Sequence, residues 1–199
     1  MRYANMTARL FFLLLLGMLA GCERNAPPGR FHASDVTGVY TQADFHLTDQ
    51  NGKPRSLSDF RGKVVVLFFG YTHCPDVCPT TLAGLAQTLR LLGKDADRVQ
   101  VLFITVDPER DTRELLAKFV PAFDPGFLGL YGDAKATAEA AKSFRVSYQK
   151  HPAKSGYTMD HSTFSYLIDT QGKVRLMAGD REPADWLAQD IRLLLASGH

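Results

Sequence analysis

The sequence predicts an α/β fold: a mixed central β-sheet flanked by helices, with a β-hairpin at the N-terminal side. Three observations carry this prediction. A continuous apolar run at residues 64–69, rich in β-branched and aromatic side chains, is typical of a strand covered on both faces. Segments with helical spacing alternate with further apolar runs. The last two strand-like segments flank a turn and precede a helix, so the sheet is expected to contain antiparallel as well as parallel neighbours.

The N-terminal hairpin is expected around the turn at residues 49–52. Phe45 and Leu47 mark an extended segment before the turn, and Leu57 and Phe60 mark a short segment after it. The turn contains Asn-Gly, which is a strong hairpin signal because both residues tolerate a positive φ.

Helical and strand-like segments alternate along the rest of the chain. Leucines at helical spacing, with Gly93 as a stop, mark a helix over residues 80–92. Asp111, with Glu114 three residues later, resembles a capping box that opens a helix over residues 113–119. The remaining elements are a strand over 99–106, an alanine-rich helix over 134–144, an antiparallel hairpin of strands 163–168 and 174–178, and a helix over 183–195. This is the order of a thioredoxin-like fold.

The first 21 residues resemble the signal peptide of a bacterial lipoprotein. Arg2 and Arg9 accompany an apolar stretch at residues 10–16 that is too short to span a bilayer. Leu-Ala-Gly before Cys22 resembles a lipobox, in which cleavage exposes the cysteine for lipidation. We therefore expect Cys22 to carry a lipid anchor that needs no transmembrane helix. The alternative is an ordinary secretory signal with an incidental cysteine.

The chain after the signal divides into a tether and one domain. Residues 22–36, with two adjacent prolines, are expected to be a flexible tether, and residues 37–199 to form the domain. Beyond Arg2 and Arg9, the chain has 21 Lys and Arg against 21 Asp and Glu, which argues against nucleic-acid binding. The expected location is the periplasmic face of a bacterial membrane, with the inner membrane preferred over the outer.

A cysteine pair lies between the predicted central strand and the helix that follows it. The segment reads Tyr71-Thr72-His73-Cys74-Pro75-Asp76-Val77-Cys78-Pro79. Because Pro75 and Pro79 lack a backbone N–H, we expect a loop that ends at a helix start, where a thiol pKa is lowered. Three residues separate Cys74 from Cys78, one more than in the C-x-x-C of disulfide oxidoreductases, which favours a metal carrier. Thiolates are soft donors that favour Cu(I) or zinc.

Two sulfurs leave the coordination shell of most metal ions incomplete, so a histidine ligand is expected. His161 is the best candidate because it precedes the strand at 163–168, whose start lies beside the cysteine loop in a thioredoxin-like sheet. From spacing alone, however, we favour an inert, hydrogen-bonded histidine at a strand end. His73, His32 and His199 are weaker candidates, since they lie in the loop itself, in the tether and at the terminus.

Two further acidic features adjoin the expected site. Residues 107–112 read Asp-Pro-Glu-Arg-Asp-Thr and follow a predicted strand. We favour a structural interpretation, a turn leading into a capped helix, although the place of this segment could also put it beside the cysteine loop. Asp76 either tunes the site or attracts a partner, or is an ordinary exposed loop residue.

Three separated motifs closely resemble the Sco/SenC family of cytochrome oxidase assembly proteins, in the family's order. They are Gly70-Tyr71-Thr72-His73-Cys74-Pro75-Asp76-Val77-Cys78-Pro79, Val106-Asp107-Pro108-Glu109-Arg110-Asp111-Thr112, and Asp160-His161-Ser162 before Tyr166-Leu167-Ile168-Asp169. The resemblance runs from about residue 45 to residue 195 and implies a thioredoxin-like fold. It also implies a copper site built from Cys74, Cys78 and His161 that holds one Cu(I) or Cu(II) per chain.

The resemblance implies partners as well as a cargo. The copper, or reducing equivalents, would go to the dinuclear copper centre of cytochrome c oxidase subunit II. A thiol reductant and another copper carrier are the further partners expected. Many members use an N-terminal transmembrane helix where this sequence has a lipobox.

Other functions compete with that of a non-enzymatic metallochaperone. A thiol-disulfide oxidoreductase would reduce target cysteines through a mixed disulfide, and the two roles can coexist. Against it, no proline stands just before Thr163, where redox-active relatives of this fold place a cis-proline. A thiol peroxidase of this fold would be expected to have a Thr-x-x-Cys motif. Here only one residue separates Thr72 from Cys74, so the spacing does not match. A purely structural lipoprotein would not explain three matching motifs.

Overall fold

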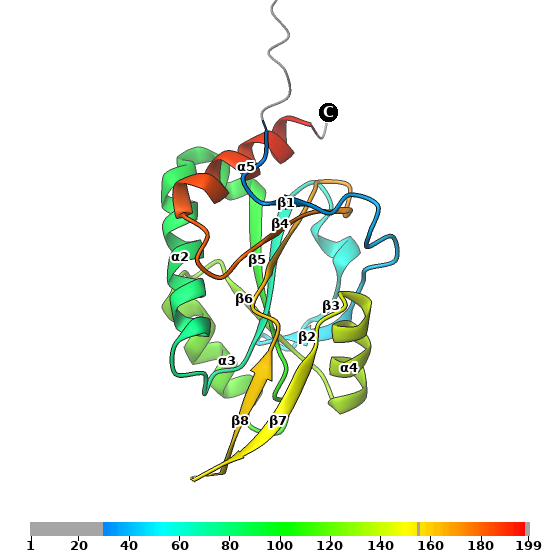
Figure 1. The fold of residues 1–199 in the computed structure, drawn as a ribbon, viewed down its shortest axis with the longest axis vertical. Coiled ribbons are helices and arrows are strands. Elements are labelled where there is room, and N and C mark those ends of the chain that lie inside the picture. The colour runs from blue at the N-terminus through cyan, green and yellow to red at the C-terminus, as the bar shows by residue number, and fades with distance from the viewer. Residues whose placement is uncertain (1–29, 155, 198–199) are drawn as a thin grey trace, which may run out of the picture. The chain divides into compact units, whose positions relative to one another are not determined.

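The computed structural model describes residues 30–154 and 156–197, and its compact unit begins at Phe31 (Figure 1). One eight-stranded sheet has the order β1-β10-β9-β4-β5-β6-β2-β3, and β7 and β8 form a separate two-stranded ribbon. The strands are β1 (Ser34–Asp35), β2 (His46–Asp49), β3 (Pro54–Ser56), β4 (Val64–Gly70), β5 (Val99–Thr105), β6 (Leu128–Tyr131), β7 (Tyr148–Ala153), β8 (Gly156–His161), β9 (Ser165–Ile168) and β10 (Val174–Ala178).

Helices cover both faces of the sheet. They are α2 (Val77–Leu92), α3 (Arg113–Phe119), α4 (Ala134–Ser143) and α5 (Ala184–Ala196), with short 3₁₀ helices η1 (Leu57–Phe60), η2 (Gly93–Arg98) and η3 (Val120–Ala122). Figure 1 shows α2 and α5 packed together on one side of the sheet and α4 on the other. The predicted α/β fold with a mixed, helix-flanked sheet is therefore confirmed. Among the described residues, no helix has the length and apolar character needed to cross a bilayer.

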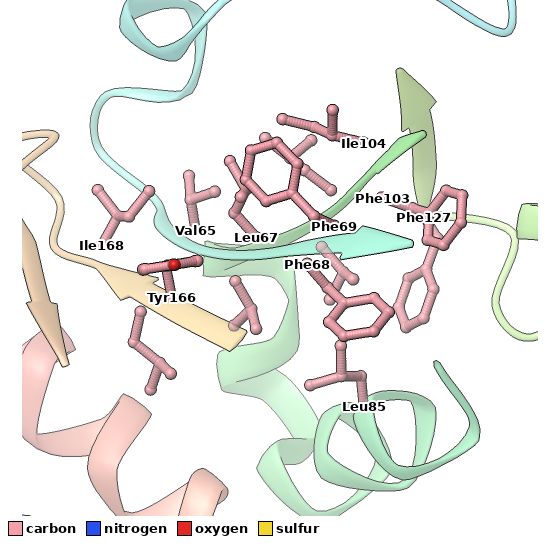
Figure 2. Close-up of a cluster of buried hydrophobic side chains, with 14 of the residues drawn as sticks. Val65, Leu67, Phe68, Phe69, Leu85, Phe103, Ile104, Phe127, Tyr166 and Ile168 are labelled. Carbon is pink, nitrogen blue, oxygen red and sulfur yellow. The ribbon is translucent and has the colours of Figure 1, made fainter. Parts of the chain in front are cut away.

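The central strand β4 explains the apolar run that dominates the sequence. It pairs in parallel with β5 and antiparallel with β9, and all seven of its residues are buried. Figure 2 shows Phe68 and Phe69 on opposite faces of the strand, with Phe68 directed toward Leu85 of α2. Because successive strand residues alternate between faces, a strand covered on both sides must be apolar throughout.

The structure confirms the N-terminal hairpin and corrects its second segment. Strands β2 and β3 pair antiparallel around a turn in which Gly52 has φ +86°. Leu57 and Phe60, however, are buried residues of η1. Strands β1 and β6 and the β7–β8 ribbon have no counterpart among the predicted elements. Each of β1 and β6 is four residues or fewer, too short for a periodic pattern to identify.

The start of one helix and the cap of another differ from the prediction. Helix α2 begins at Val77, three residues earlier than expected, and places Cys78 and Pro79 in its first turn. A proline is tolerated there because a first-turn N–H has no partner within the helix. Helix α3 is capped by Thr112, whose side chain accepts a hydrogen bond from the Leu115 N–H. The predicted capping by Asp111 is wrong because its carboxylate bonds elsewhere.

The predicted tether overlaps the folded unit. The N–H groups of His32 and Ala33 donate to the Asp190 carboxylate at 2.9 and 2.8 Å. Ala33 is buried, and the two residues of β1 pair with β10. The end of the expected 22–36 tether is therefore fixed to the domain from Phe31 onward. The expected signal at 1–21, the expected lipidation site Cys22 and the histidine candidate His199 lie outside the described residues.

Candidate metal centre

The ligand atoms of Cys74, Cys78 and His161 converge at the end of the central strand. The two sulfurs and a ring nitrogen all lie within 4.8 Å of one another. Cys78 Sγ is 3.5 Å from His161 Nε2, although 83 positions separate the two residues in the chain. Within residues 30–154 and 156–197, this is the one such group of three histidine, cysteine or acidic residues. It can hold one metal ion.

Sheet topology brings His161 to the cysteines. Strand β9 runs antiparallel to β4 with Ser165 opposite Phe68, so the start of β9 lies beside the end of β4. His161 ends β8, a few residues before β9 begins. The expectation that this histidine approaches the cysteine loop therefore agrees with the structure, although the residue closes one strand rather than directly preceding the next.

Gly70 leaves room for the Cys78 sulfur at the end of β4. A Cβ atom at this position would lie 2.8 Å from Cys78 Sγ and 2.8 Å from the Phe103 ring. Real Cβ atoms essentially never come so close to a neighbour. Cys78 is fully buried, while Cys74 is partly exposed at the mouth of the loop. The site thus has one sheltered sulfur and one accessible sulfur.

The two thiols differ in acidity. A hydrogen bond from the Cys78 thiol lowers the pKa of Cys74 to about 3 against the effect of burial, and the backbone N–H groups of Asp76 and Cys78 add to it. The Cys78 N–H, in the first turn of α2, lies 3.4 Å from Cys74 Sγ. The same hydrogen bond, together with burial, raises the pKa of Cys78. The metal-free pair is therefore a Cys74 thiolate beside a Cys78 thiol.

The ring of His161 is oriented for ligation. Its Nδ1 lies 2.9 Å from the Ser162 carbonyl oxygen. A carbonyl only accepts hydrogen bonds, so Nδ1 carries the hydrogen and Nε2 directs its lone pair at the sulfurs. The rings of Phe68 and Tyr71 pack edge to face with the imidazole, with ring centroids 6.0 and 5.8 Å from its centroid. Such a backbone contact at the second nitrogen is what fixes a metal-binding tautomer.

The two weaker histidine candidates that the structure describes, His73 and His32, are not part of this group. His73 is half-exposed, with Nδ1 at 3.1 Å from the Thr72 hydroxyl and 3.7 Å from an Asp111 carboxylate oxygen. His32 stacks on Trp186 with ring centroids 4.7 Å apart. Asp76, also considered from the sequence, is exposed and accepts a hydrogen bond from Thr80.

Asp111 supports the cysteine loop, whereas the sequence pattern favoured a helix-capping role for this residue. Its buried carboxylate accepts hydrogen bonds from the Thr72 N–H at 3.0 Å, the Thr72 hydroxyl at 2.6 Å and the Thr105 hydroxyl at 2.6 Å. Gly70 and Thr105 are partners at the ends of the parallel strands β4 and β5. Segments that follow two neighbouring parallel strands meet at one sheet edge. The structure therefore agrees with the less favoured interpretation of residues 107–112, in which the segment lies beside the cysteine loop.

Comparison with known proteins agrees with this geometry. A model of the SCO1/SenC family matches residues 35–196. The mitochondrial SCO2 homologue of mouse is 41% identical over 162 residues, covering 79% of this chain and 64% of the relative. For its human counterpart the identity is 41% over 160 residues, covering 78% and 60%. The chain thus spans less than two thirds of the length of these curated relatives.

Solved structures of Sco proteins also superpose on this chain. ScoI of Bradyrhizobium japonicum with copper bound superposes with a TM-score of 0.70 at 44% identity, covering 75% of this chain and 96% of that one. Yeast Sco1 with copper bound has a TM-score of 0.72 at 33% identity, covering 78% and 88%. Fold and site together define a thioredoxin-like protein with a Cys-Cys-His group that can hold a metal ion. The chain belongs to the SCO1/SenC family.

Proposed function

We propose that this chain is a membrane-tethered, extracytoplasmic copper chaperone that delivers copper to the dinuclear copper centre of cytochrome c oxidase subunit II. The observation that carries the proposal is the convergence of two sulfurs and one imidazole nitrogen within 4.8 Å. Family members from Bradyrhizobium, Arabidopsis and yeast have structures with copper bound. The family member BsSco is described as belonging to a family of cytochrome c oxidase assembly proteins.

The ligand set suits a cargo that must leave again. Thiolate and imidazole donors select Cu(I) and Cu(II) over hard cations such as magnesium and calcium. Three ligands leave copper open on one side, so a thiol or imidazole of the target can bind before Cys74, Cys78 or His161 lets go. Both cysteines must be reduced to bind, and a Cys74–Cys78 disulfide would release copper and prevent reloading. A thiol reductant is therefore a necessary partner, and another copper carrier is the expected donor.

An anaerobic copper titration of the full chain tests the ligand set. Reduced protein should bind about one copper per chain, and the Cu(II) form should have an intense sulfur-to-copper charge-transfer band. His161→Ala should weaken binding sharply, whereas His73→Ala, the matched histidine beside Cys74, should bind as wild type does. Unchanged affinity and spectrum in His161→Ala would refute the ligand set.

Delivery is tested by mixing the copper-loaded chain with the copper-free domain of cytochrome c oxidase subunit II. The absorption of the dinuclear copper centre should appear in the acceptor as copper leaves the donor. No transfer from loaded wild type, under reducing conditions that keep the acceptor cysteines open, would limit the chain to copper storage.

The membrane anchor is proposed from the lipobox. Labelling cells with a radioactive fatty acid should mark the wild-type chain and leave Cys22→Ser unlabelled. Cys22→Ser should also fractionate with the soluble periplasm. Labelling that survives Cys22→Ser would refute anchoring through this residue.

Thiol-disulfide exchange is a second candidate function, favoured by the asymmetry of the pair. Cys74 is the partly exposed thiolate that could attack a target disulfide, and Cys78 is the buried thiol that could resolve the mixed disulfide. Catalytic reduction of a protein disulfide without copper should then survive His161→Ala and vanish in Cys74→Ser. Turnover no faster than that of a free thiol would exclude this function.

A further inference from the structure

The position of His161 depends on the β7–β8 ribbon. This ribbon is a separate two-stranded sheet with no ladder to the eight-stranded one, and Figure 1 shows it extending from one end of the domain. His161 is the last residue of β8. Contacts other than strand pairing must therefore hold the ribbon, and with it the histidine, against the rest of the protein.

One face of β8 is turned toward the domain. Tyr157, Met159 and His161 are each more buried than their neighbours along the strand, and Met159 is 7% exposed. Residues two apart lie on the same face of a strand, so these three side chains share one face. Contacts that fix Tyr157 against the domain therefore also fix the position of His161 on the same strand.

Asp107, Arg110 and Tyr157 form a closed set of contacts, which we call the clamp. Arg110 Nε donates to one carboxylate oxygen of Asp107, and the Tyr157 hydroxyl donates to the other at 2.7 Å. Arg110 Nη1 donates to the Tyr157 carbonyl oxygen at 2.8 Å, and the guanidinium carbon lies 3.6 Å from the centre of the Tyr157 ring. Asp107 is 2% exposed, so the carboxylate of this ion pair is shielded from water, while the Arg110 side chain is partly exposed.

The clamp adjoins the metal centre. The Arg110 guanidinium carbon also lies 5.8 Å from the centre of the Tyr71 ring. That ring in turn meets the His161 imidazole edge to face. Arg110 thus contacts both Tyr157 of β8 and Tyr71, the tyrosine whose ring packs on the His161 imidazole.

A second contact between the same segments is of a different kind. Lys150 Nζ lies 2.6 Å from both carboxylate oxygens of Glu109, but both side chains are largely exposed. Exposed ion pairs contribute little because water and salt screen them. The buried clamp, and not this pair, is expected to fix the ribbon.

We infer that Asp107, Arg110 and Tyr157 are positioning residues that hold β8 against the domain, so that His161 meets the cysteines before copper arrives. The inference rests on the proposed ligand set. A ligand fixed in advance spares the binding step the entropy cost of ordering a mobile ribbon. Loss of the clamp would therefore lower copper affinity without touching any ligand.

Arg55 provides a matched control for the test. Its Nε donates to the buried Asp49 carboxylate, and its guanidinium lies over the Phe60 ring, at the far edge of the sheet. Side-chain exposure is 18% for Arg55 and 24% for Arg110. Arg55→Met and Arg110→Met therefore remove the same kind of buried ion pair, but only one of them adjoins His161.

The experiment measures Cu(I) affinity by chelator competition, the Cu(II) charge-transfer spectrum and thermal unfolding in full-chain variants. Arg110→Met should lower affinity about 10- to 100-fold, the range for residues that orient a metal ligand, and should shift the spectrum. Tyr157→Phe should lower the affinity and shift the spectrum to a smaller extent. Arg55→Met should lose thermal stability while keeping wild-type affinity and spectrum, and Glu109→Gln should change none of the three.

Hydrogen exchange gives a readout without metal. In the copper-free protein, amides of β8 should exchange faster in Arg110→Met and not in Arg55→Met. Equal effects of the two arginine variants on affinity, or wild-type affinity in both Arg110→Met and Tyr157→Phe, would overturn the clamp. If Arg110→Met does not fold, Tyr157→Phe decides alone. A wild-type affinity in His161→Ala would instead refute the ligand set itself.

Discussion

At the scale of single residues, the chemistry of this site depends on two residues that are not ligands, Gly70 and Ser162, as well as on the ligands themselves. Gly70 has no side chain to displace the Cys78 sulfur, and the Ser162 carbonyl accepts the one ring proton that would otherwise compete for His161 Nε2. Neither residue is a metal ligand. Each determines whether a ligand atom is available.

Gly70→Ala should damage both fold and site. The added methyl group would overlap Cys78 Sγ and the Phe103 ring in a fully packed region, which costs about 1–3 kcal/mol of unfolding free energy. Copper affinity should fall as well, because the sulfur must move. Gly84→Ala is the control: it lies in α2 with open space around it and should be neutral or stabilising. Equal stability of the two variants in chemical denaturation would contradict the prediction.

The thiolate of Cys74 should persist at low pH in reduced, copper-free protein. Its lowered pKa, about 3, means that the group stays ionised as pH falls well below the range in which an ordinary thiol takes up a proton. Alkylation of Cys74 should therefore remain fast at about pH 5, where a free thiol of pKa about 8.5 has slowed strongly. Removing the Cys78 thiol in Cys78→Ala should raise the pH at which alkylation slows. A pH profile like that of a free thiol would contradict this assignment.

At the scale of elements, two hairpins in different parts of the sheet have the same kind of turn. Residues 49–55 read Asp-Gln-Asn-Gly-Lys-Pro-Arg and residues 169–175 read Asp-Thr-Gln-Gly-Lys-Val-Arg. In each, one aspartate oxygen accepts two backbone N–H groups, and the arginine pairs with the other oxygen. The glycine has a positive φ, +86° at Gly52 and +80° at Gly172. The glycine supplies the positive φ and the aspartate satisfies the turn's donors.

Asp49→Asn should destabilise the protein in a pH-dependent way. Despite burial, the backbone N–H of Lys53, the Arg55 side chain and the N–H of Asn51 lower the pKa of Asp49. A lowered pKa contributes stability that is fully present above the unfolded-state pKa of about 4 and is lost as pH falls through the folded-state pKa.

The measurement is chemical denaturation of wild type and Asp49→Asn across pH. The variant should lose about 1–3 kcal/mol at neutral pH, and the difference should shrink as pH falls below about 4. Asp97→Asn, at an exposed position, serves as the control. A difference that does not depend on pH would mean that the Asp49 charge contributes nothing.

At the scale of the whole molecule, the metal centre joins two segments that no strand pairing connects. Cys74 and Cys78 are connected to the central strand and α2, and His161 to the β7–β8 ribbon. A copper ion bound by all three would cross-link the ribbon to the core. Binding to the folded state alone stabilises that state by mass action.

Copper should therefore raise the unfolding temperature of the reduced chain. At a free copper concentration 100 times the dissociation constant, the gain is about 2.7 kcal/mol. A strong Cu(I) chelator should reverse it, and the double variant Cys74→Ser with Cys78→Ser should show no gain. A copper-induced rise of equal size in the double variant would place the bound ion elsewhere.

Features of this protein that depend on local interactions could be predicted from the sequence, whereas contacts between distant segments could not. Residues 64–69 were identified as a central strand because burial on both faces leaves no choice but apolar residues. The Asn-Gly turn and the helix over 113–119 were found for similarly local reasons. The role of Asp111 was missed because its partners Thr72 and Thr105 are brought to it only by pairing of β4 with β5.

By itself, the sequence determined the fold class, the cysteine loop and the identity of three candidate ligands, because local pattern and motif carry that information. Only the tertiary structure decided that His161 Nε2 lies 3.5 Å from Cys78 Sγ and that Arg110 clamps the strand that brings it there. The physical reason is distance along the chain: contacts between residues tens of positions apart leave no periodic trace in the sequence, and form only when the sheet has set its strand order.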